Sequence, residues 1–547
     1  MRNLIEALAA QGEAYAPRTG AARALLCMTL LVFAGAWMTG CTSENELYCD
    51  EDTPCNDAEL SFCDLEAHEC VAPPAGRCSV DGDCTEAEEP ICDEGARECR
   101  GCADEEECAG GLVCAESGAC VEPCESSAEC DDELPICTDA GSCELCGVAG
   151  GDAACEDRDD ERPYCVDESV CGACRDNLDC DGGTRVCDDE SLECRPCEDH
   201  GECESEVCDL DGGTCVAEED VVYVEADAEN SSAECTFGAP CETIGEGVEA
   251  AGDTREYVLV RAGDYEERVE IDAQAELTLV GEQGAVVTPE NTPAFEVRDQ
   301  SEVRIEGLVV EGEGDASGEA IFCREQSTLE LADMRIADHN GTGLESRDCT
   351  LTVEASEITG NDGGGIDASG GTLTVEASEI TGNEGGGIDL SSASFTLQNN
   401  LIVDNGDGDS TVGGVRLDGS FADSSVFEFN TVANNIAGGV NARGVSCLTA
   451  SGSLAFSSNI VYGNQGDQID GEACTYSYSN IENGPSGDGN IDEDPEFVND
   501  SDGDFRLQPE SPCIEAADPG ATLSRDFAGI ERPQGERHDI GAYEFAP

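Results

Sequence analysis

A direct repeat constrains this chain more than any other feature of its sequence. Residues 350–371 read TLTVEASEITGNDGGGIDASGG, residues 372–393 read TLTVEASEITGNEGGGIDLSSA, and the two segments agree at 18 of 22 positions. A fixed period of about 20 to 50 residues is typical of stacked or arrayed architectures. Because one such unit cannot bury its apolar face alone, it must stack on its neighbours. The repeat therefore predicts a solenoid and says little about activity.

The pattern inside the repeat indicates which kind of solenoid forms. Apolar Leu351 and Val353 alternate with polar residues, the period of a strand with one buried face. Ile358 marks a second short apolar face, Ile366 and Ala368 mark a third, and glycines between them supply turns. Three short strands per 22 residues predict an all-β fold, a parallel β-helix. The leucine and asparagine framework of a leucine-rich repeat is absent.

An asparagine recurs at what we expect to be the same turn of successive rungs. The steps between these residues are 21, 22, 22, 30 and 29 positions. Stacked amides can donate and accept along the helix axis, so they favour a buried structural ladder over contact with a ligand. The longer steps predict loops inserted around residues 406–414 and 420–425, and such loops often carry binding. The predicted ladder consists of Asn340, Asn361, Asn383, Asn405, Asn435 and Asn464.

Cysteines dominate the region before the predicted β-helix. Of 37 cysteines, 28 lie between Cys49 and Cys215, in seven groups of four. In an exported chain, units too small for an apolar core are held by disulfides, and four cysteines allow three pairings. We favour bonds from first to third and from second to fourth; metal binding is the rival reading, although Cys-x2-Cys steps only join neighbouring units. The first two groups are Cys49, Cys55, Cys63, Cys70 and Cys78, Cys84, Cys92, Cys99.

The N-terminus reads as an export signal. An apolar run at residues 24–38 follows Arg18 and Arg23, and its length fits a signal-peptide core better than a membrane span. The segment ends in Met-Thr-Gly-Cys41, which resembles a bacterial lipobox whose cysteine is lipidated. We expect a lipid anchor at Cys41 and a place in the outer membrane or at the cell surface of a Gram-negative bacterium. A cleaved signal with an incidental cysteine is the alternative.

The charge balance excludes some partners. The chain carries 123 acidic and 25 basic residues, a formal charge of −98, and every basic residue is arginine. So acidic a surface repels the phosphates of nucleic acids and anionic lipids. We therefore expect no nucleic-acid partner and contact with a membrane only through the lipid anchor. Adaptation to high salt and a genome that prefers arginine codons both explain the missing lysine, and the oligomeric state stays open.

Three segments resemble known families. The sequence from 221 to 271, with PCETIGEGVEAA at 240–251 and GDY at 263–265, resembles the start of right-handed β-helices of the pectin-lyase-like superfamily, whose first helix caps the coil. Within that cap Cys235 and Cys241 are expected to bridge. The C-terminus, with NIDEDPEF at 490–497 and DIGAYE at 539–544, resembles a choice-of-anchor Q domain. The cysteine groups resemble Dickkopf-like repeats of myxobacterial-type surface lipoproteins.

These patterns divide the chain into four parts. We expect a lipoprotein signal peptide at 1–40, seven disulfide-rich repeats forming a stalk at 41–218, a right-handed parallel β-helix with an N-terminal cap at 219–489, and the choice-of-anchor Q-like segment at 490–547. The expected function is surface display of a β-helix for binding or for a structural or adhesive role, with an extracellular glycan as ligand.

Signals for chemistry are weak. The pectin-lyase-like resemblance implies a polysaccharide lyase or glycoside hydrolase as the alternative function, but basic candidates on the middle rungs are few, Arg416 and Arg443, and the four histidines are scattered. We expect no cofactor apart from calcium as a candidate. An Asp-rich turn that includes Asp500, Asp502 and Asp504 resembles a calcium loop without its later glutamate. A solvated turn is the competing interpretation.

Overall fold

A computed structural model describes the backbone of 62–64 and 69–71, Cys84, residues 91–93 and 98–103 and, with short gaps, residues 107–546. The longest gaps after residue 107 lie at 131–135, 138–142, 147–150, 313–317, 439–443 and 449–453. The chain divides into two compact units, Met1–Cys171 and Gly172–Pro547. No helix in the described residues combines the length and apolar character needed to cross a membrane.

The cysteine modules contain small antiparallel hairpins, and each of the five modules between Cys102 and Cys215 is held by two disulfides. From the third module onward the first cysteine bonds the third and the second bonds the fourth, as in Cys102–Cys114 and Cys108–Cys120. The same interlocking pattern recurs in the four modules that follow. It is the arrangement that the sequence favours, because two crossed bonds constrain a unit that has almost no apolar core.

The elements of the modules are short. The strands are β1 (Phe62–Asp64), β2 (Glu69–Val71), β3 (Ile91–Asp93), β4 (Glu98–Arg100), β5 (Val113–Cys114), β6 (Cys120–Val121), β7 (Ile136–Cys137), β8 (Cys143–Glu144), β9 (Tyr164–Val166), β10 (Val170–Gly172), β11 (Val186–Cys187), β12 (Cys194–Arg195), β13 (Cys208–Asp209) and β14 (Thr214–Cys215). The fifth module also contains the helix α3 (Asp152–Arg158), which explains its wider cysteine spacing.

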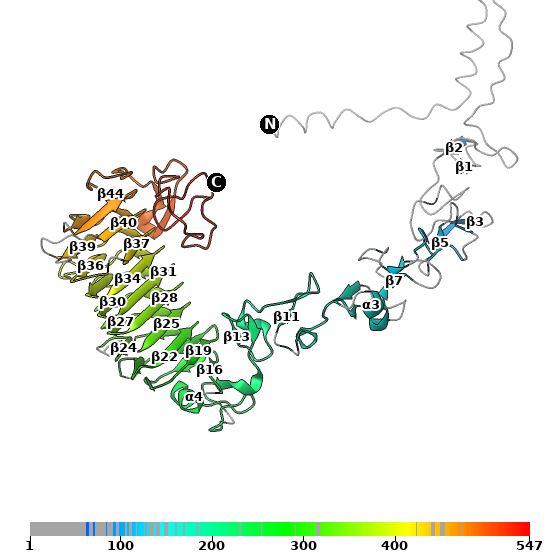
Figure 1. The fold of residues 1–547 in the computed structure, drawn as a ribbon, viewed down its shortest axis with the longest axis horizontal. Coiled ribbons are helices and arrows are strands. Elements are labelled where there is room, and N and C mark those ends of the chain that lie inside the picture. The colour runs from blue at the N-terminus through cyan, green and yellow to red at the C-terminus, as the bar shows by residue number, and fades with distance from the viewer. Residues whose placement is uncertain are drawn as a thin grey trace, which may run out of the picture. The chain divides into compact units, whose positions relative to one another are not determined.

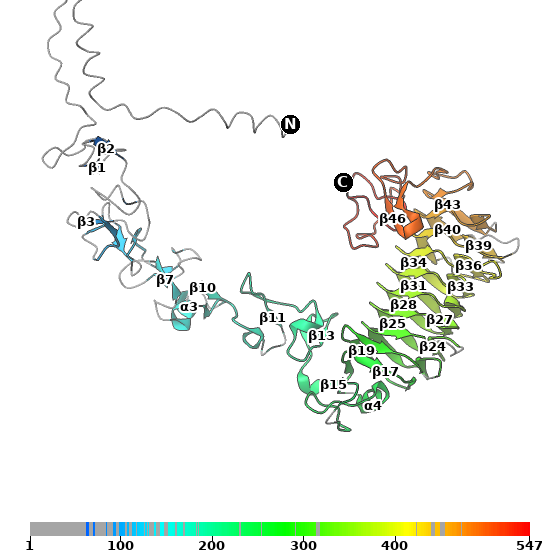
Figure 2. The same cartoon turned by 180° about the vertical axis from the view of Figure 1, so that it is seen from behind.

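Three parallel sheets form a β-helix after residue 220, as the repeat predicts (Figure 1, Figure 2). Sheet 1 contains β15 (Val221–Val224), β16 (Tyr257–Val260), β19 (Leu277–Gly281), β22 (Glu302–Glu306), β25 (Thr328–Ala332), β28 (Thr350–Glu354), β31 (Thr372–Glu376), β34 (Ser394–Gln398), β37 (Val426–Glu428), β40 (Leu454–Ser457) and β43 (Cys474–Ser477).

Sheets 2 and 3 complete each turn. Sheet 2 contains β17 (Gly263–Tyr265), β20 (Ala285–Val287), β23 (Val309–Glu311), β26 (Arg335–Ala337), β29 (Glu357–Thr359), β32 (Glu379–Thr381), β35 (Leu401–Val403), β38 (Thr431–Ala433), β41 (Ile460–Tyr462) and β44 (Asn480–Ile481). Sheet 3 contains β18 (Val269–Asp272), β21 (Phe295–Arg298), β24 (Ile321–Arg324), β27 (Thr342–Arg347), β30 (Gly364–Ser369), β33 (Ile388–Ser391), β36 (Val415–Asp418), β39 (Val445–Leu448) and β42 (Ile469–Asp470).

The core lies inside the coil, where the alternating apolar residues of the repeat meet. Leu351 stacks on Leu373 and Val353 on Val375 in the register of β28 and β31, and all four are buried. Toward the C-terminal end the core becomes aromatic, with Phe427 and Phe456 at 4.8 Å between ring centroids. Burying such a side chain contributes about 1.5–3 kcal/mol relative to its exposure, so stacking neighbouring rungs is what stabilises each one.

A helix closes the N-terminal end of the coil. Thr243 caps α4 (Ile244–Ala250) by accepting a hydrogen bond from the main-chain N–H of Glu246. Ile244 and Val248 bury themselves against the first strands, and Gly247 lies so close that an added Cβ would come within 2.5 Å of Val224. The helix therefore covers the open end of the coil, as the sequence predicts.

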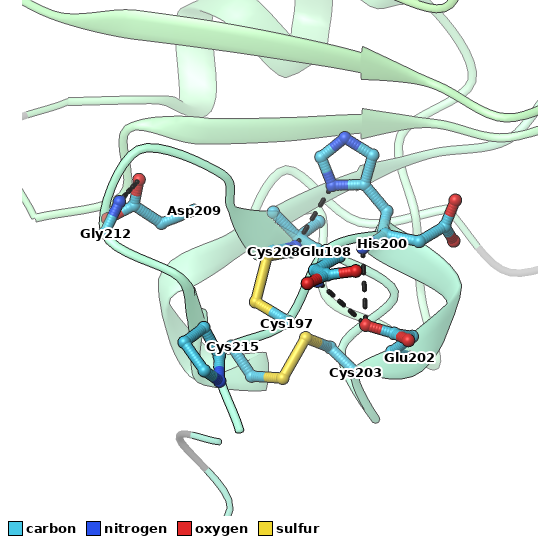
Figure 3. The surroundings of a disulfide bond; sticks show 12 residues. Cys197, Glu198, His200, Glu202, Cys203, Cys208, Asp209, Gly212 and Cys215 are labelled. Atoms are coloured by element: carbon cyan, nitrogen blue, oxygen red, sulfur yellow. Dashed lines mark hydrogen bonds between the residues drawn. A yellow bond between two sulfur atoms is a disulfide. The ribbon is translucent and has the colours of Figure 1, made fainter. Parts of the chain in front are cut away.

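The seventh module packs against sheet 1 of the β-helix. Its Val207 joins a buried cluster with Tyr223, Leu259 and Val280. Figure 3 shows His200 in the module accepting a hydrogen bond at Nδ1 from the main-chain N–H of Cys208, at 3.1 Å. The other ring nitrogen, Nε2, lies 2.9 Å from the carboxylate of Glu306 on β22. The module thus covers the outward face of the first rungs of sheet 1.

The C-terminal segment covers the outward face of sheet 2. Its hairpin of β45 (Phe497–Asn499) and β46 (Asp504–Leu507) places Phe505 against outward-facing Leu401 and Val403. Beyond it, the guanidinium of Arg532 pairs with Glu544 at 3.0 Å, and both side chains are almost fully buried. The outward positions of sheet 2 are polar on the two preceding strands, β29 and β32, and apolar on β35, where this segment packs on them.

Candidate functional site

The predicted asparagine ladder is buried inside the coil. The Nδ2 group of Asn361 donates to Oδ1 of Asn383 at 2.9 Å, and Asn383 repeats this bond to Asn405. Asn405 bonds Asn435 at 3.1 Å, and Asn435 bonds Asn464 at 2.9 Å. The main-chain N–H of each residue also donates to the next Oδ1. Because every amide is satisfied within the coil, this ladder is structural.

The prediction for Asn340 is wrong, because this residue is exposed and lies one position past the ladder. The ladder position is occupied by buried His339, whose main-chain N–H donates to Oδ1 of Asn361 at 3.1 Å. The sequence contained a sign of this error: the step from Asn340 to Asn361 is 21 residues, whereas the duplicated rungs repeat every 22 residues.

Sequence reasoning missed a second ladder at the turn between sheets 1 and 2. Asn400 donates from Nδ2 to Oδ1 of Asn430 at 3.0 Å, and Asn430 to Asn459 at 3.1 Å. Ser356 and Ser378 hold the same position on the duplicated rungs. The steps of 30 and 29 residues match those of the first ladder, which is the signal that could have found it.

The structure places the predicted cysteines only in part. Cys84 bonds Cys99, Cys92 is also disulfide-bonded, and Cys235 bonds Cys241 in the cap. Cys63 and Cys70 are partners in the backbone register of β1 and β2. The lipidation candidate Cys41 lies outside the described residues, as do Cys49, Cys55 and Cys78. The metal-like clusters of sulfur atoms in the described modules consist of cysteines that are already joined in disulfides.

Two further disulfides lie inside the β-helix and were not predicted. Cys323 on β24 bonds Cys349, and Cys447 on β39 bonds Cys474 on β43. They tie neighbouring turns together across 26 and 27 residues. Only the stacking of the rungs brings these pairs within bonding distance.

The calcium candidates do not converge on one point. Asp504 pairs with Arg506 at 2.6 Å, and Asp502 accepts a hydrogen bond from Asn499. In the described part of the chain, the groups of three or more ligand atoms within 4.8 Å of one another contain only cysteines. The turn around Asp500 ends at Gly503 in the left-handed region, as in a solvated Asp-Gly turn.

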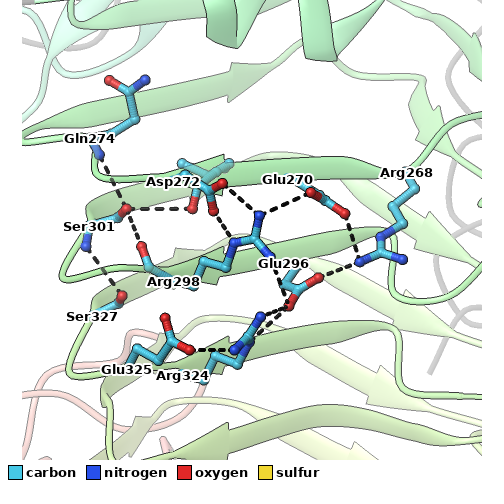
Figure 4. A network of polar contacts seen from close by, with 11 residues as sticks. Arg268, Glu270, Asp272, Gln274, Glu296, Arg298, Ser301, Arg324, Glu325 and Ser327 are labelled. Atoms are coloured by element: carbon cyan, nitrogen blue, oxygen red, sulfur yellow. Dashed lines mark hydrogen bonds and ion pairs between the residues drawn. The ribbon is translucent and has the colours of Figure 1, made fainter.

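The outward side chains of sheet 3 form a polar surface that contains several ion pairs. We call this set the sheet 3 face. Figure 4 shows its N-terminal half, where Arg298 pairs with Glu270 and Asp272, and Arg324 pairs with Glu296 at 2.7 Å. Burial raises the pKa of Glu296, but hydrogen bonds from Arg324 and Arg268 outweigh it, so the net shift is downward. In this half of the face, each arginine is therefore paired with at least one carboxylate.

An aromatic ring interrupts the network on β24. Phe322 is half-buried and points outward beside two arginines. The guanidinium carbon of Arg347 lies 5.1 Å from its ring centroid and that of Arg324 lies 5.9 Å away. A cation near an aromatic face gains about 0.5–1 kcal/mol at an exposed site. The Arg347 side chain is 61 % exposed, so it can move away from the ring at little cost.

A row of carboxylates follows on the next three strands. Glu345, Asp367 and Asp389 stand in register on β27, β30 and β33. Removal of water from around these groups raises the pKa of all three. At the two ends of the row, Glu345 pairs with Arg347, and Asp389 pairs with Arg416 at 2.7 Å. Asp367 in the middle is exposed, and the more distant guanidinium groups of Arg416 and Arg347 partly offset the rise in its pKa.

An inserted loop borders the end of this row. The segment 404–414 between β35 and β36 is much longer than the corresponding turn of the duplicated rungs. Its Thr411 hydroxyl lies 3.5 Å from the guanidinium of Arg416. Arg416, a basic candidate from the sequence, is therefore a partner of Asp389 at the loop-bordered end of the row; Arg443 lies outside the described residues.

Comparisons with known proteins agree with the fold. A family model described as the right handed beta helix region matches residues 294–484, so the coil is a right-handed β-helix. A second model, described as a family of unknown function (DUF8331), matches residues 113–221 across the later cysteine modules. Each match covers less than half of the chain. No curated protein matches the sequence.

Similar solved structures are distant. Pectate lyase Pel9A shares 16% identity, over 60% of this chain and 100% of that chain, with a TM-score of 0.42. The catalytic domain of a GH87 alpha-1,3-glucanase in complex with nigerose shares 12% identity, over 49% of this chain and 59% of that chain, with a TM-score of 0.29. The A-module of the Azotobacter vinelandii mannuronan C-5 epimerase AlgE4 shares 12%, over 50% and 100%, at 0.19. At these values the likeness says nothing about activity.

Proposed function

We propose that this protein is an exported surface protein whose cross-linked modules hold out a β-helix that binds an extracellular glycan along the sheet 3 face. The observation that carries the proposal is the row of register-matched outward side chains on sheet 3, from Phe322 through Glu345 and Asp367 to Asp389. Parallel strands repeat about every 4.8 Å, so the row offers regularly spaced contacts to an extended polymer.

Parts of the other two sheets are covered by other segments of the chain, which favours sheet 3 as the binding face. The seventh module covers Leu259 and Val280 on sheet 1, and the C-terminal segment covers Leu401 and Val403 on sheet 2. Outward residues of sheet 3 instead make ion pairs with one another. Carboxylates and guanidinium groups together can accept from and donate to sugar hydroxyls, and a half-buried aromatic ring supplies apolar contact area.

The test is a binding panel with the purified full-length chain. Soluble polysaccharides are titrated by calorimetry against the wild type and against Phe322→Ala, whose side chain points outward and does not support the core. We expect at least one polysaccharide to bind, and the variant to bind it at least about tenfold more weakly. Absence of binding across the panel, or binding unaffected by the variant, would refute the role of this face.

The lipid anchor is part of the same proposal. A cysteine-rich array placed between Cys41 and the β-helix would hold the binding face away from the membrane. Mass spectrometry of the N-terminal peptide from the native host should show an acylated Cys41, and Cys41→Ala should release the protein from the membrane fraction. An unmodified N-terminus cut elsewhere would leave the protein exported but not anchored.

A polysaccharide-degrading enzyme is the second candidate, and one observation favours it. Asp367 and Asp389 stand on neighbouring strands and both have raised pKa values, and retaining glycosidases hold two carboxyl groups about 5–5.5 Å apart. Incubation of the bound polysaccharide with wild type and with Asp367→Asn, followed by assays for reducing ends and for double-bond absorbance, separates binding from cleavage. Product formation by the wild type alone would establish the enzyme.

A further inference from the structure

We infer that the ligand of the sheet 3 face is an uncharged polysaccharide, stacked on Phe322 and hydrogen-bonded by the carboxylate row. This inference rests on the proposed function and names its ligand class. It depends on the pairing of the charges on this face, on the position of the aromatic ring, and on the charge of the whole chain.

The cations of the face are already neutralised. Arg268, Arg298, Arg324, Arg347 and Arg416 all form ion pairs with carboxylates on the same or the neighbouring strand. A uronate or sulfate group would have to break such a pair, or meet a carboxylate directly, because the carboxylates of this face outnumber its arginines. The formal charge of −98 on the whole chain adds long-range repulsion of any polyanion.

An uncharged sugar avoids both costs. Its hydroxyls can donate to Glu345, Asp367 and Asp389 and can accept from guanidinium N–H groups without separating the pair of Arg416 and Asp389. Hydrogen bonds to charged groups are shorter and stronger than those between neutral groups. Asp367 is the best placed of the three, because it is exposed and lies between two occupied pairs.

The aromatic ring fixes one end of the contact. Phe322 is in register with Glu345 of the next strand, so a polymer that lies along the helix axis passes the ring and then one carboxylate on each following strand. The exposed Arg347 guanidinium beside the ring can swing out, giving up its pair with Glu345, and leave a ring face for the apolar side of a sugar. A pair with so exposed a partner contributes little to stability. Aromatic side chains provide such contacts at little cost in conformational entropy.

The experiment compares polysaccharides that share a backbone and differ in charge. Hydroxyethyl cellulose is paired with carboxymethyl cellulose, dextran with dextran sulfate, and hydroxypropyl starch with carboxymethyl starch, each titrated against the full-length chain at about 20 and 300 mM NaCl. We expect an uncharged polysaccharide to bind at least about tenfold more tightly than its charged partner. The affinity for the uncharged polysaccharide should change little with NaCl concentration, because no counterions are released.

Two variants connect the result to this face. Phe322→Ala should weaken binding of the uncharged polysaccharide at least about tenfold relative to the wild type. Phe322→Trp should bind within about threefold of the wild-type affinity. Phe237→Ala is the matched control, since Phe237 is an exposed aromatic in the N-terminal cap and should leave binding unchanged. Far-UV circular dichroism confirms that all variants are folded.

The outcomes separate the inference from the function on which it rests. Tighter, salt-sensitive binding of charged members that Phe322→Ala weakens would overturn the uncharged ligand class and leave glycan binding at this face intact. Binding that responds to Phe237→Ala but not to Phe322→Ala would overturn the site. If none of the polysaccharides binds, both the inference and the proposed function fail.

Discussion

His339 and Asn340 are neighbours in the chain, yet only His339 enters the ladder of buried side chains. The difference follows from register, because a shift of one residue turns a side chain from the inside of a rung to its outside. Within the described part of the chain, neither ring nitrogen of His339 makes a hydrogen bond of good geometry, although the main chain of Val310 lies near the ring. This residue is therefore a weak point at the start of an otherwise satisfied ladder.

Replacing His339 should change how stability depends on pH. Burial lowers the pKa of His339 below its usual value of 6.5, so the unfolded chain takes up the proton first as pH falls. Stability is therefore lost from about pH 6.5 downward. His339→Asn removes this loss and can continue the ladder to Asn361. Urea unfolding at pH 7.5 and 5 should show the variant gaining on the wild type as pH falls; parallel profiles would contradict this.

Cutting the ladder in the middle should cost much more than a change beside it. Asn383→Leu keeps a branched side chain of similar shape but removes the Oδ1 atom that accepts from both the Nδ2 group and the main-chain N–H of Asn361. We expect a loss of about 2–4 kcal/mol in unfolding free energy. Glu384→Ala, at the exposed position directly after Asn383, should cost less than about 0.5 kcal/mol. Equal urea midpoints for the two variants would show that the ladder contributes little.

At the scale of elements, what covers each sheet depends on segments distant in sequence. Val207 in the seventh module packs against Leu259 on sheet 1, and Phe505 packs against Leu401 on sheet 2. The C-terminal segment is held by the buried pair of Arg532 and Glu544, with the Arg532 guanidinium carbon 4.7 Å from the centroid of the Phe429 ring. A buried charge that loses its partner is costly, which makes this pair the point at which the segment can be released.

Releasing the C-terminal segment should leave the coil folded. Arg532→Met leaves Glu544 buried and unpaired, and we expect a penalty of about 3–5 kcal/mol that falls on residues 490–547. Limited proteolysis should then cut within that segment while the β-helix resists. The control is Arg506→Met, which removes an arginine that is 65 % exposed and should cost no more than about 1 kcal/mol. Identical cleavage patterns in both variants would refute the docking role of Arg532.

At the scale of the whole molecule, two principles of stabilisation meet in one chain. The modules replace an apolar core by crossed disulfides that close loops of 11 to 19 residues. The β-helix buries a continuous core and adds disulfides only at its cap and between turns. Removing the disulfides should therefore affect the two parts unequally.

Reduction tests this inequality directly. A disulfide that closes a loop of about 15 residues contributes about 3 kcal/mol, so a module of about 25 residues should lose its structure without its two bonds. In excess phosphine reductant, hydrogen exchange should become fast in the described modules between Cys84 and Cys215, while strands of the β-helix stay protected. Thiol labelling confirms reduction; protected amides in fully reduced modules would contradict the account.

The sequence alone predicted the β-helix, and it favoured the crossed pairing within the cysteine modules without deciding among the three possible pairings. Both follow from local rules repeated many times: the alternation of Leu351 and Val353 with polar residues decides which face is buried, and crossed bonds between cysteines 11 to 19 residues apart need no distant partner. It also predicted the ladder from Asn361 to Asn464, because the spacing of those residues follows the rungs.

Tertiary structure decided what depends on adjacency between rungs. Rung length varies with inserted loops, so counting along the chain misplaced Asn340 and could not pair Cys323 with Cys349 or Cys447 with Cys474. Among 123 acidic residues, nothing in the sequence distinguishes Glu345, Asp367 and Asp389. They form a row because stacking of the rungs places them in register on neighbouring strands. A period specifies that rungs stack; the loops between them determine which side chains meet.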